Sequence, residues 1–155
     1  MTLRLRRFLS GHLGRAEGGT AVVEFVFLAV VLMVPLIYLV MVLSRLQAGA
    51  YAASSAAREA GRAFVTASSA AAAPGRAQAA ARIAFGDQGF RGDQAHLDMS
   101  CDGRPCLRPD GRIETVATVT VPLPLVPAFA RRVVPLEVPL TARHLSVVDR
   151  FRDAP

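Results

Sequence analysis

The chain has 155 residues, enough for one small domain, and an apolar segment near the N-terminus takes part of that length. The formal net charge is +6, but the basic residues are spread along the chain without a dense block. The chain has no tryptophan and only two tyrosines, so it is poorly supplied for stacking on bases. We therefore expect no nucleic-acid partner.

The chain begins with a basic leader, residues 1–19. It carries Arg4, Arg6, Arg7 and Arg15 against a single acidic residue, Glu17. The next basic residues are Arg45, Arg58 and Arg62. An excess of positive charge on the N-terminal side favours a cytoplasmic N-terminus, because basic flanks tend to stay on the cytoplasmic side of a membrane. The residues after Arg45 are then expected outside the cytoplasmic membrane.

A long apolar segment follows the leader. Twenty residues without charge, 25–44, come directly after Glu24. A helix of that length spans about 30 Å, the thickness of the hydrocarbon core of a bilayer. Signal peptides have shorter apolar cores. We therefore predict a transmembrane helix, which Pro35 bends without breaking.

Residues 46–73 are rich in alanine and lack proline, so we expect the transmembrane helix to continue through them as a stalk. Residues spaced three and four apart form a stripe along this stalk. They are Ala48, Ala52, Ser55, Glu59, Arg62 and Thr66. Small residues at such spacing would let a neighbouring helix approach closely, and the alternative is a solvated helix.

A second helix and three strands are predicted after the stalk. Pro74 cannot continue a helix but is favoured in a first turn, so the second helix is expected over residues 75–85, ending at Gly86. The strand-like segments are residues 95–100, 113–122 and 136–148. In the second of them Ile113, Thr115, Ala117, Val119 and Val121 alternate strictly with Glu114, Val116, Thr118 and Thr120.

Two cysteines, Cys101 and Cys106, lie in the turn-rich connection between the first two strands. An even count outside the membrane suits a local disulfide if this region faces an oxidising compartment. The spacing is not that of a CxxC redox or zinc site, and we expect no metal and no cofactor. The connection between the last two strands, PLPLVPAFARRVVP, is apolar and is either covered by the fold or a contact surface.

The predicted fold class is α+β. A long N-terminal transmembrane helix extends into a stalk and is followed by a short helix and a small antiparallel sheet of three or four strands. A sheet this small needs a helix on one face, and the stalk and the second helix are the candidates. The expected segments are the leader, residues 1–19; the transmembrane helix and stalk, residues 20–73; and an extracytoplasmic domain, residues 74–155.

The stretch GGTAVVEFVFLAVV contains a glycine pair, four further residues and then Glu24 and Phe25 at the start of the apolar segment. After a basic leader, this pattern resembles the class III signal of type IV pilin-like proteins. With the stalk AASSAAREAGRAF and the small β-rich C-terminal part, the chain is similar to the TadE-like family, the pseudopilins of the tight-adherence (Flp-type) pilus machinery. The similarity is strongest over residues 14–64 and implies a pilin-like fold.

In that family a prepilin peptidase cuts on the cytoplasmic side after the glycine, and the acid at position five of the mature protein is kept. For this chain the resemblance implies a cut between Gly19 and Thr20, which makes Glu24 the fifth mature residue. A carboxylate near a membrane is costly unless paired. The resemblance implies pairing with the amino group of a neighbouring subunit, so Glu24 and Phe25 are the expected assembly residues.

The resemblance implies a minor pseudopilin that takes part in assembly of a tight-adherence type IV pilus or a related secretion apparatus. The protein would cross the cell membrane once, with its N-terminus in the cytoplasm and its C-terminal domain outside, and would reach the cell surface if assembled into the fibre. The expected partners are the membrane, the major pilin, a sister pseudopilin, the prepilin peptidase and the inner-membrane platform protein.

Two other readings stay open, a generic single-pass accessory protein and a secreted binding domain cut near Ala50. An enzyme is not expected, because no catalytic constellation is apparent. His96 lies near Asp98 and His144 near Asp149, but alternation along strands produces such neighbours freely. The chain has no glycine-rich phosphate loop and no HExxH motif.

Overall fold

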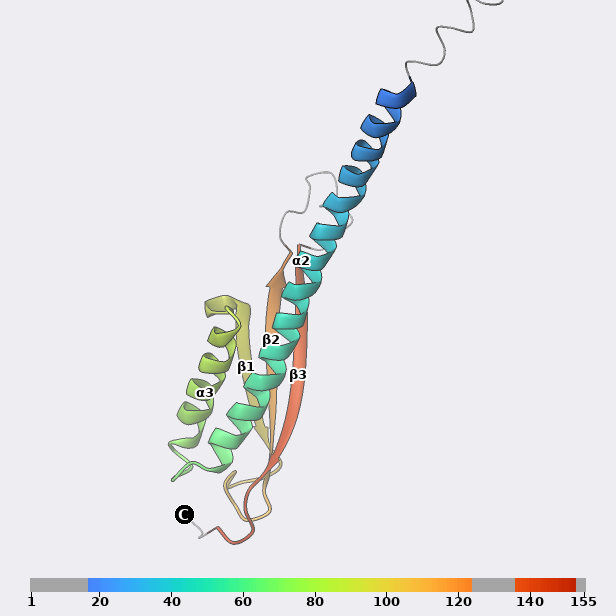
Figure 1. Ribbon diagram of the computed structural model, residues 1–155. Helices are drawn as coiled ribbons and strands as arrows, with labels where there is room; N and C mark the ends of the chain where they lie inside the picture. Colours follow the sequence, from blue (N-terminus) through green and yellow to red (C-terminus); the bar gives the residue numbers. More distant parts are fainter. Residues whose placement is uncertain (1–16, 124–135, 153–155) are drawn as a thin grey trace, which may run out of the picture. The chain divides into compact units, whose positions relative to one another are not determined.

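The structure is a computed structural model that describes residues 17–123 and 136–152, with side chains described from residue 21 onward. Its elements are α2 (Glu17–Val65), α3 (Ala73–Asp87), the 3-10 helix η1 (Gly92–Gln94), β1 (Ala95–Cys101), β2 (Arg112–Pro122) and β3 (Glu137–Val147) (Figure 1). The predicted α+β class is confirmed. The chain forms two compact units, Met1–Met41 and Val42–Pro155, and the boundary between them falls within α2.

The sheet has the strand order β1-β2-β3, and both pairs are antiparallel. In the register, Ala117 at the centre of β2 lies opposite Leu97 of β1 and Ala142 of β3. The alternation predicted for β2 is confirmed, because its odd-numbered residues are buried and its even-numbered residues are half-buried from Glu114 to Thr120. The sheet therefore has one covered face and one more open face.

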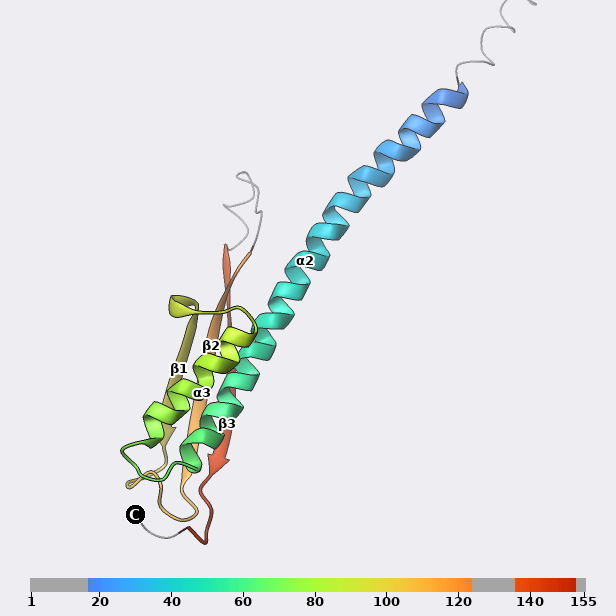
Figure 2. The ribbon, with the colours of Figure 1, turned by 60° about the vertical axis from the view of Figure 1, so that its left-hand side comes forward.

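Residues 42–65 of α2, together with α3, cover the buried face of the sheet (Figures 1 and 2). The buried side chains of both helices are mostly alanines. They are Ala52, Ala53, Ala56, Ala57 and Ala60 in α2 and Ala73, Ala77, Ala81 and Ala84 in α3. Such small side chains let the helices lie close to the sheet. The buried hydroxyl of Thr115 in β2 donates a hydrogen bond of 2.8 Å to the carbonyl oxygen of Ala57.

Two glycines of α2 mark its closest approaches to the sheet. A Cβ atom added at Gly61 would clash with the hydroxyl of Ser146 in β3. A Cβ atom added at Gly49 would clash with Val121 Cγ2 and lie 3.0 Å from Leu140 Cδ1. A methyl group at either position would therefore force a neighbouring side chain or backbone segment to move.

The first helix ends at Val65, eight residues before the position expected from its alanine content. The β-branched Val65 and Thr66 have lower helix propensity than alanine, and the Thr66 hydroxyl donates to the carbonyl oxygen of Arg62 at 2.8 Å. The Arg152 guanidinium donates to the carbonyl oxygens of Val65, at 2.7 Å, and Ala67. These contacts bring a positive charge and hydrogen-bond donors to the C-terminal end of α2.

The stripe predicted along the stalk coincides only in part with the face that packs on the chain's own core, against which Ala48 also lies. Ala52 is buried, but Glu59, Arg62 and Thr66 are exposed. The packed face instead contains Gly49, Ala52, Ala53, Ala56, Ala57, Ala60 and Phe64, and it contacts the chain's own core. The second helix, expected over residues 75–85, runs two residues further at each end.

The edge position of β3 explains its proline. Val121 pairs with Val138 and Thr120 with Pro139, while the Val148 N–H donates to the Gly111 carbonyl oxygen at 2.8 Å. Even-numbered residues of β3 therefore direct their N–H groups toward β2, and Pro139 falls where an N–H would face away from the sheet.

The apolar connection predicted before β3 falls mostly on residues 124–135, which lie outside the described residues.

Candidate functional site

Among the described residues, one helix is long enough and apolar enough to cross a membrane, and it is α2. The candidate span is Ala21–Val65, and its most apolar window has a mean hydropathy of 3.0. Its large side chains are exposed in the unit Met1–Met41, with Phe25 and Leu32 each 73% exposed. Soluble proteins rarely leave so long an apolar surface uncovered. The helix continues through Pro35, as predicted.

The residues expected to be processed and to assemble all lie on α2. Gly19 and Thr20 fall within its first turn. Glu24 is exposed and is the only charged residue between positions 21 and 44. Phe25, the next residue, is also exposed. Helical periodicity places positions 20 and 24 on the same face of α2, one turn apart.

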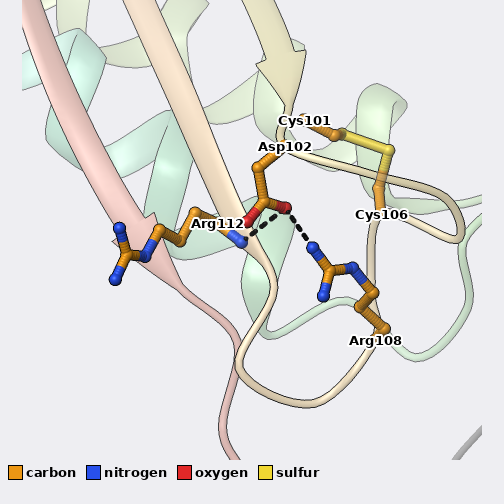
Figure 3. Close-up of a disulfide and its surroundings, with 5 residues drawn as sticks. All are labelled: Cys101, Asp102, Cys106, Arg108 and Arg112. Carbon is orange, nitrogen blue, oxygen red and sulfur yellow. Dashed lines mark hydrogen bonds and ion pairs between the residues drawn. A yellow bond between two sulfur atoms is a disulfide. The ribbon is translucent and has the colours of Figure 1, made fainter.

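The predicted disulfide between Cys101 and Cys106 is present (Figure 3). Cys101 is the last residue of β1, and the two Cα atoms are 5.5 Å apart. Closing so short a loop in the unfolded chain contributes about 2 kcal/mol to stability on the chain-entropy estimate. Leu107, the residue after the bridge, is fully buried and attaches the same loop to the core.

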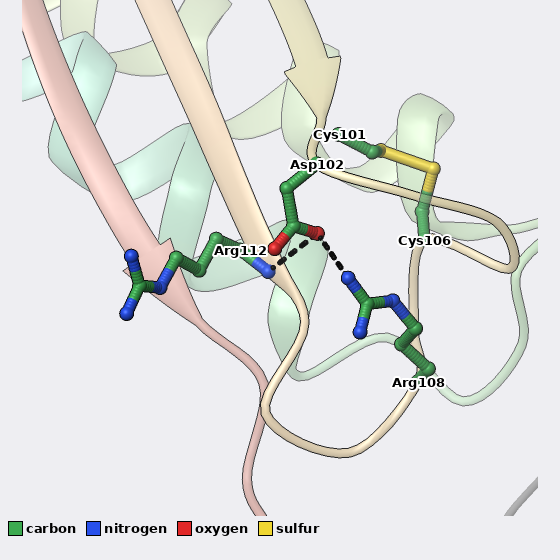
Figure 4. A network of polar contacts seen from close by, with 5 residues as sticks. All are labelled: Cys101, Asp102, Cys106, Arg108 and Arg112. Atoms are coloured by element: carbon green, nitrogen blue, oxygen red, sulfur yellow. Dashed lines mark hydrogen bonds and ion pairs between the residues drawn. A yellow bond between two sulfur atoms is a disulfide. The ribbon is translucent and has the colours of Figure 1, made fainter.

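Asp102, beside the disulfide, links the two ends of the connection between β1 and β2 (Figure 4). Its Oδ1 atom accepts a hydrogen bond of 3.0 Å from the Arg112 backbone N–H and one of 2.9 Å from the Arg108 guanidinium. The hydrogen bond from Arg112 is the main reason why the pKa of Asp102 lies below 3.8, and the charge of Arg108 acts in the same direction. Partial desolvation opposes this shift.

We expect Asp102→Asn to lower the stability of the unit Val42–Pro155 at neutral pH but not in acid. Because the folded-state pKa lies below the ordinary value, the carboxylate favours folding above that value. This contribution is lost as the pH falls through the folded-state pKa. Thermal unfolding of the full chain at about pH 7 and about pH 2.5 measures the difference.

The control for this experiment is Asp93→Asn, which changes an exposed aspartate that has no ion pair or side-chain hydrogen bond to a described residue. Its unfolding temperature should follow that of the unaltered chain at both pH values. If the unfolding temperature of the Asp102→Asn variant lay below that of the unaltered chain by the same amount at both pH values, the charge of Asp102 would not be what stabilises the fold.

The C-terminal residues make two contacts that sequence reasoning missed. Arg150 Nε lies 3.2 Å from Asp110 Oδ2 in the connection between β1 and β2. Arg152 contacts the end of α2, as described above. The DG pairs correctly indicated turns, and Asp110 has a positive φ of 58°. No local signal in the sequence connects either arginine with a partner tens of residues away.

Neither of the two histidines in the described residues, His96 and His144, belongs to a metal-binding cluster. His96 Nε2 lies 3.3 Å from Asp98 Oδ1 on the open face of the sheet, and both side chains are largely exposed. His144 is half-buried in β3. No group of three or more His, Cys, Asp or Glu residues in the described part of the chain could hold a metal ion.

Comparison of the chain with protein-family models, curated proteins and solved structures finds no match.

Proposed function

We propose that this chain is a membrane-anchored, TadE-like minor pseudopilin that takes part in assembly of a tight-adherence type IV pilus or a related secretion apparatus. In this proposal its role is structural, and it catalyses no reaction. Its partners are the membrane, the major pilin, a sister pseudopilin, the prepilin peptidase and the inner-membrane platform protein. Its N-terminus lies in the cytoplasm and the unit Val42–Pro155 outside.

The observation that carries the proposal is the continuity of α2. One helix begins at Glu17, contains an exposed apolar segment with a single carboxylate, and ends at Val65 after packing on the sheet. An anchor joined to a folded domain by continuous helix suits a subunit that assembles through its N-terminal part. The disulfide supports an oxidising location for the domain.

The alternative of a secreted domain cut near Ala50 is disfavoured by packing. Gly49 is buried, and Leu46 packs against the core, so both belong to the same compact unit as the sheet. A cut near Ala50 would remove them from it. The remaining alternative, a generic single-pass accessory protein, predicts no processing at the glycine pair.

The N-terminal residue of the purified protein tests the proposal. We expect Thr20, because the resemblance implies a cut after Gly19. We expect Gly19→Leu to block that cut, since a large side chain at the scissile bond would not fit a site that takes glycine, and intact-mass measurement would then give the uncut chain. Gly18→Leu is the matched control, and its mature end should still be Thr20. A mature protein beginning at Met1, or near Ala50, would contradict the proposal.

We expect Glu24→Gln to leave processing intact but to reduce the amount of this chain in sheared pilus fractions about tenfold, because an unpaired partner charge at a membrane is costly. No hydrogen bond or ion pair joins Glu24 to another described side chain, so the change removes nothing from the fold. Glu24→Asp keeps the charge and should retain most of the assembly. Normal amounts of the Gln variant in pili would contradict the assembly role.

A further inference from the structure

A groove of about 730 Å³ lies between α3 and the start of β1 in the unit Val42–Pro155. Phe85, Phe90 and Leu97 line it and are buried in the core, so the groove has an apolar base. Ile83 also lines it and is 67% exposed. The groove therefore offers apolar contact area to a bulky apolar side chain of another molecule.

Two arginines line the same groove without an acidic partner among the described residues. Arg82 Nε donates to the Gln78 carbonyl oxygen at 3.3 Å, in its own helix, and the Arg91 side chain forms no hydrogen bond or ion pair with a described residue. By contrast, Arg108, Arg143 and Arg150 each lie within 4.0 Å of a carboxylate. Asp87 is the single acidic residue in the lining, which leaves an excess of one positive charge with His96 neutral.

One wall of the groove is a strand edge. Within the part of the chain that the structure describes, β1 is an edge strand that pairs with β2, and a side chain of α3 reaches its other edge. At that edge the Gln78 side chain donates a hydrogen bond of 3.4 Å to the Leu97 carbonyl oxygen. This bond is long, and it stands where a neighbouring strand would otherwise donate a backbone N–H. Strand edges of this kind bind extended peptides through main-chain hydrogen bonds, while adjacent pockets select the side chains.

We infer that the groove docks an extended segment of a partner protein that places a bulky apolar side chain between α3 and β1 and carboxylates opposite Arg82 and Arg91. The apolar base selects the anchor side chain. The excess positive charge selects the acidic flanks. This inference uses only the unit Val42–Pro155 and stands independently of pilus assembly and of the membrane segment.

The test is selection of displayed random short peptides on the full chain in lipid nanodiscs. We expect the recovered peptides to carry a large apolar residue flanked by Asp or Glu. The strongest peptide, labelled with a fluorophore, then gives affinities by anisotropy. Arg82→Glu with Arg91→Glu should weaken it about tenfold, since two exposed ion pairs are replaced by repulsion.

The matched control is Arg58→Glu with Arg76→Glu, which makes the same change of charge at exposed helix positions outside the groove. It should bind the peptide as the unaltered chain does, and both double variants should unfold at similar temperatures. Ile83→Asp should also weaken binding, through the apolar contact. The proposal is overturned if no peptide is enriched, if the enriched peptides lack the acidic and apolar signature, or if the groove and control variants bind equally well.

Discussion

Replacing Gly49 by valine is expected to destabilise the unit Val42–Pro155 by about 3 kcal/mol. The new side chain would clash with Val121, which is fully buried, and crowd Leu140. Val121 is β-branched and stiff, so it cannot turn away. In hydrogen–deuterium exchange of the full chain, the amides of β2 should exchange about a hundredfold faster than in the unaltered protein.

Gly75→Val is the matched control, because it makes the same substitution in α3 at a position where the added Cβ has no neighbour within 4 Å apart from its adjoining residues and the nearby backbone of its own helix. Exchange in β2 should be unchanged there. If β2 were equally protected in the Gly49 variant, α2 would not lie as close to the sheet as the structure has it.

Placing two arginines in the apolar segment, Leu32→Arg with Leu36→Arg, is expected to release most of the chain from membranes. Both leucines are more than half exposed on α2. Each arginine near the centre of a bilayer costs about 3 kcal/mol, so the pair offsets much of the gain from inserting the apolar segment. The measurement is the fraction that stays in the membrane pellet after extraction with alkaline carbonate.

The control here is Gln47→Arg with Ala50→Arg, which adds the same charges at exposed positions of α2 beyond the apolar segment. This variant should remain in the membrane pellet. Equal retention of the two variants, or an unaltered chain that carbonate extracts completely, would mean that the apolar segment does not span the bilayer.

The sheet could be predicted from sequence because its signals are local. Alternation in β2 identified the buried face from Ile113 to Val121, and the turn residues between Cys101 and Cys106 located the disulfide loop. Both patterns depend on residues that are neighbours in the chain. The predicted strand limits accordingly agree with the structure to within one residue at every end.

The contacts between distant segments could not be predicted in this way. An alanine-rich helix has no amphipathic pattern that distinguishes its faces, so the sequence did not identify the face with Ala52 and Ala56 as the one that packs on the sheet. The end of α2 at Val65 is stabilised by Arg152, which lies 87 positions later. The processing and assembly roles of Gly19 and Glu24 depend on other proteins and stay predictions.

The two glycines of α2 also bear on how the domain would carry a mechanical load. Gly49 and Gly61 lie twelve residues apart, about 18 Å along the helix axis, and each faces a different strand residue, Val121 or Ser146. A slide of residues 42–65 by one helical turn would place Ala53 and Val65 at those two positions, where a methyl or larger group would clash with the side chain of Val121 or Ser146. Within the unit Val42–Pro155 the helix runs along the strands (Figure 2), so tension on it would load this contact in shear. Both glycine positions would then resist sliding of α2 along the sheet at the same time, so we expect the helix to separate from the sheet in one step and not to slide gradually.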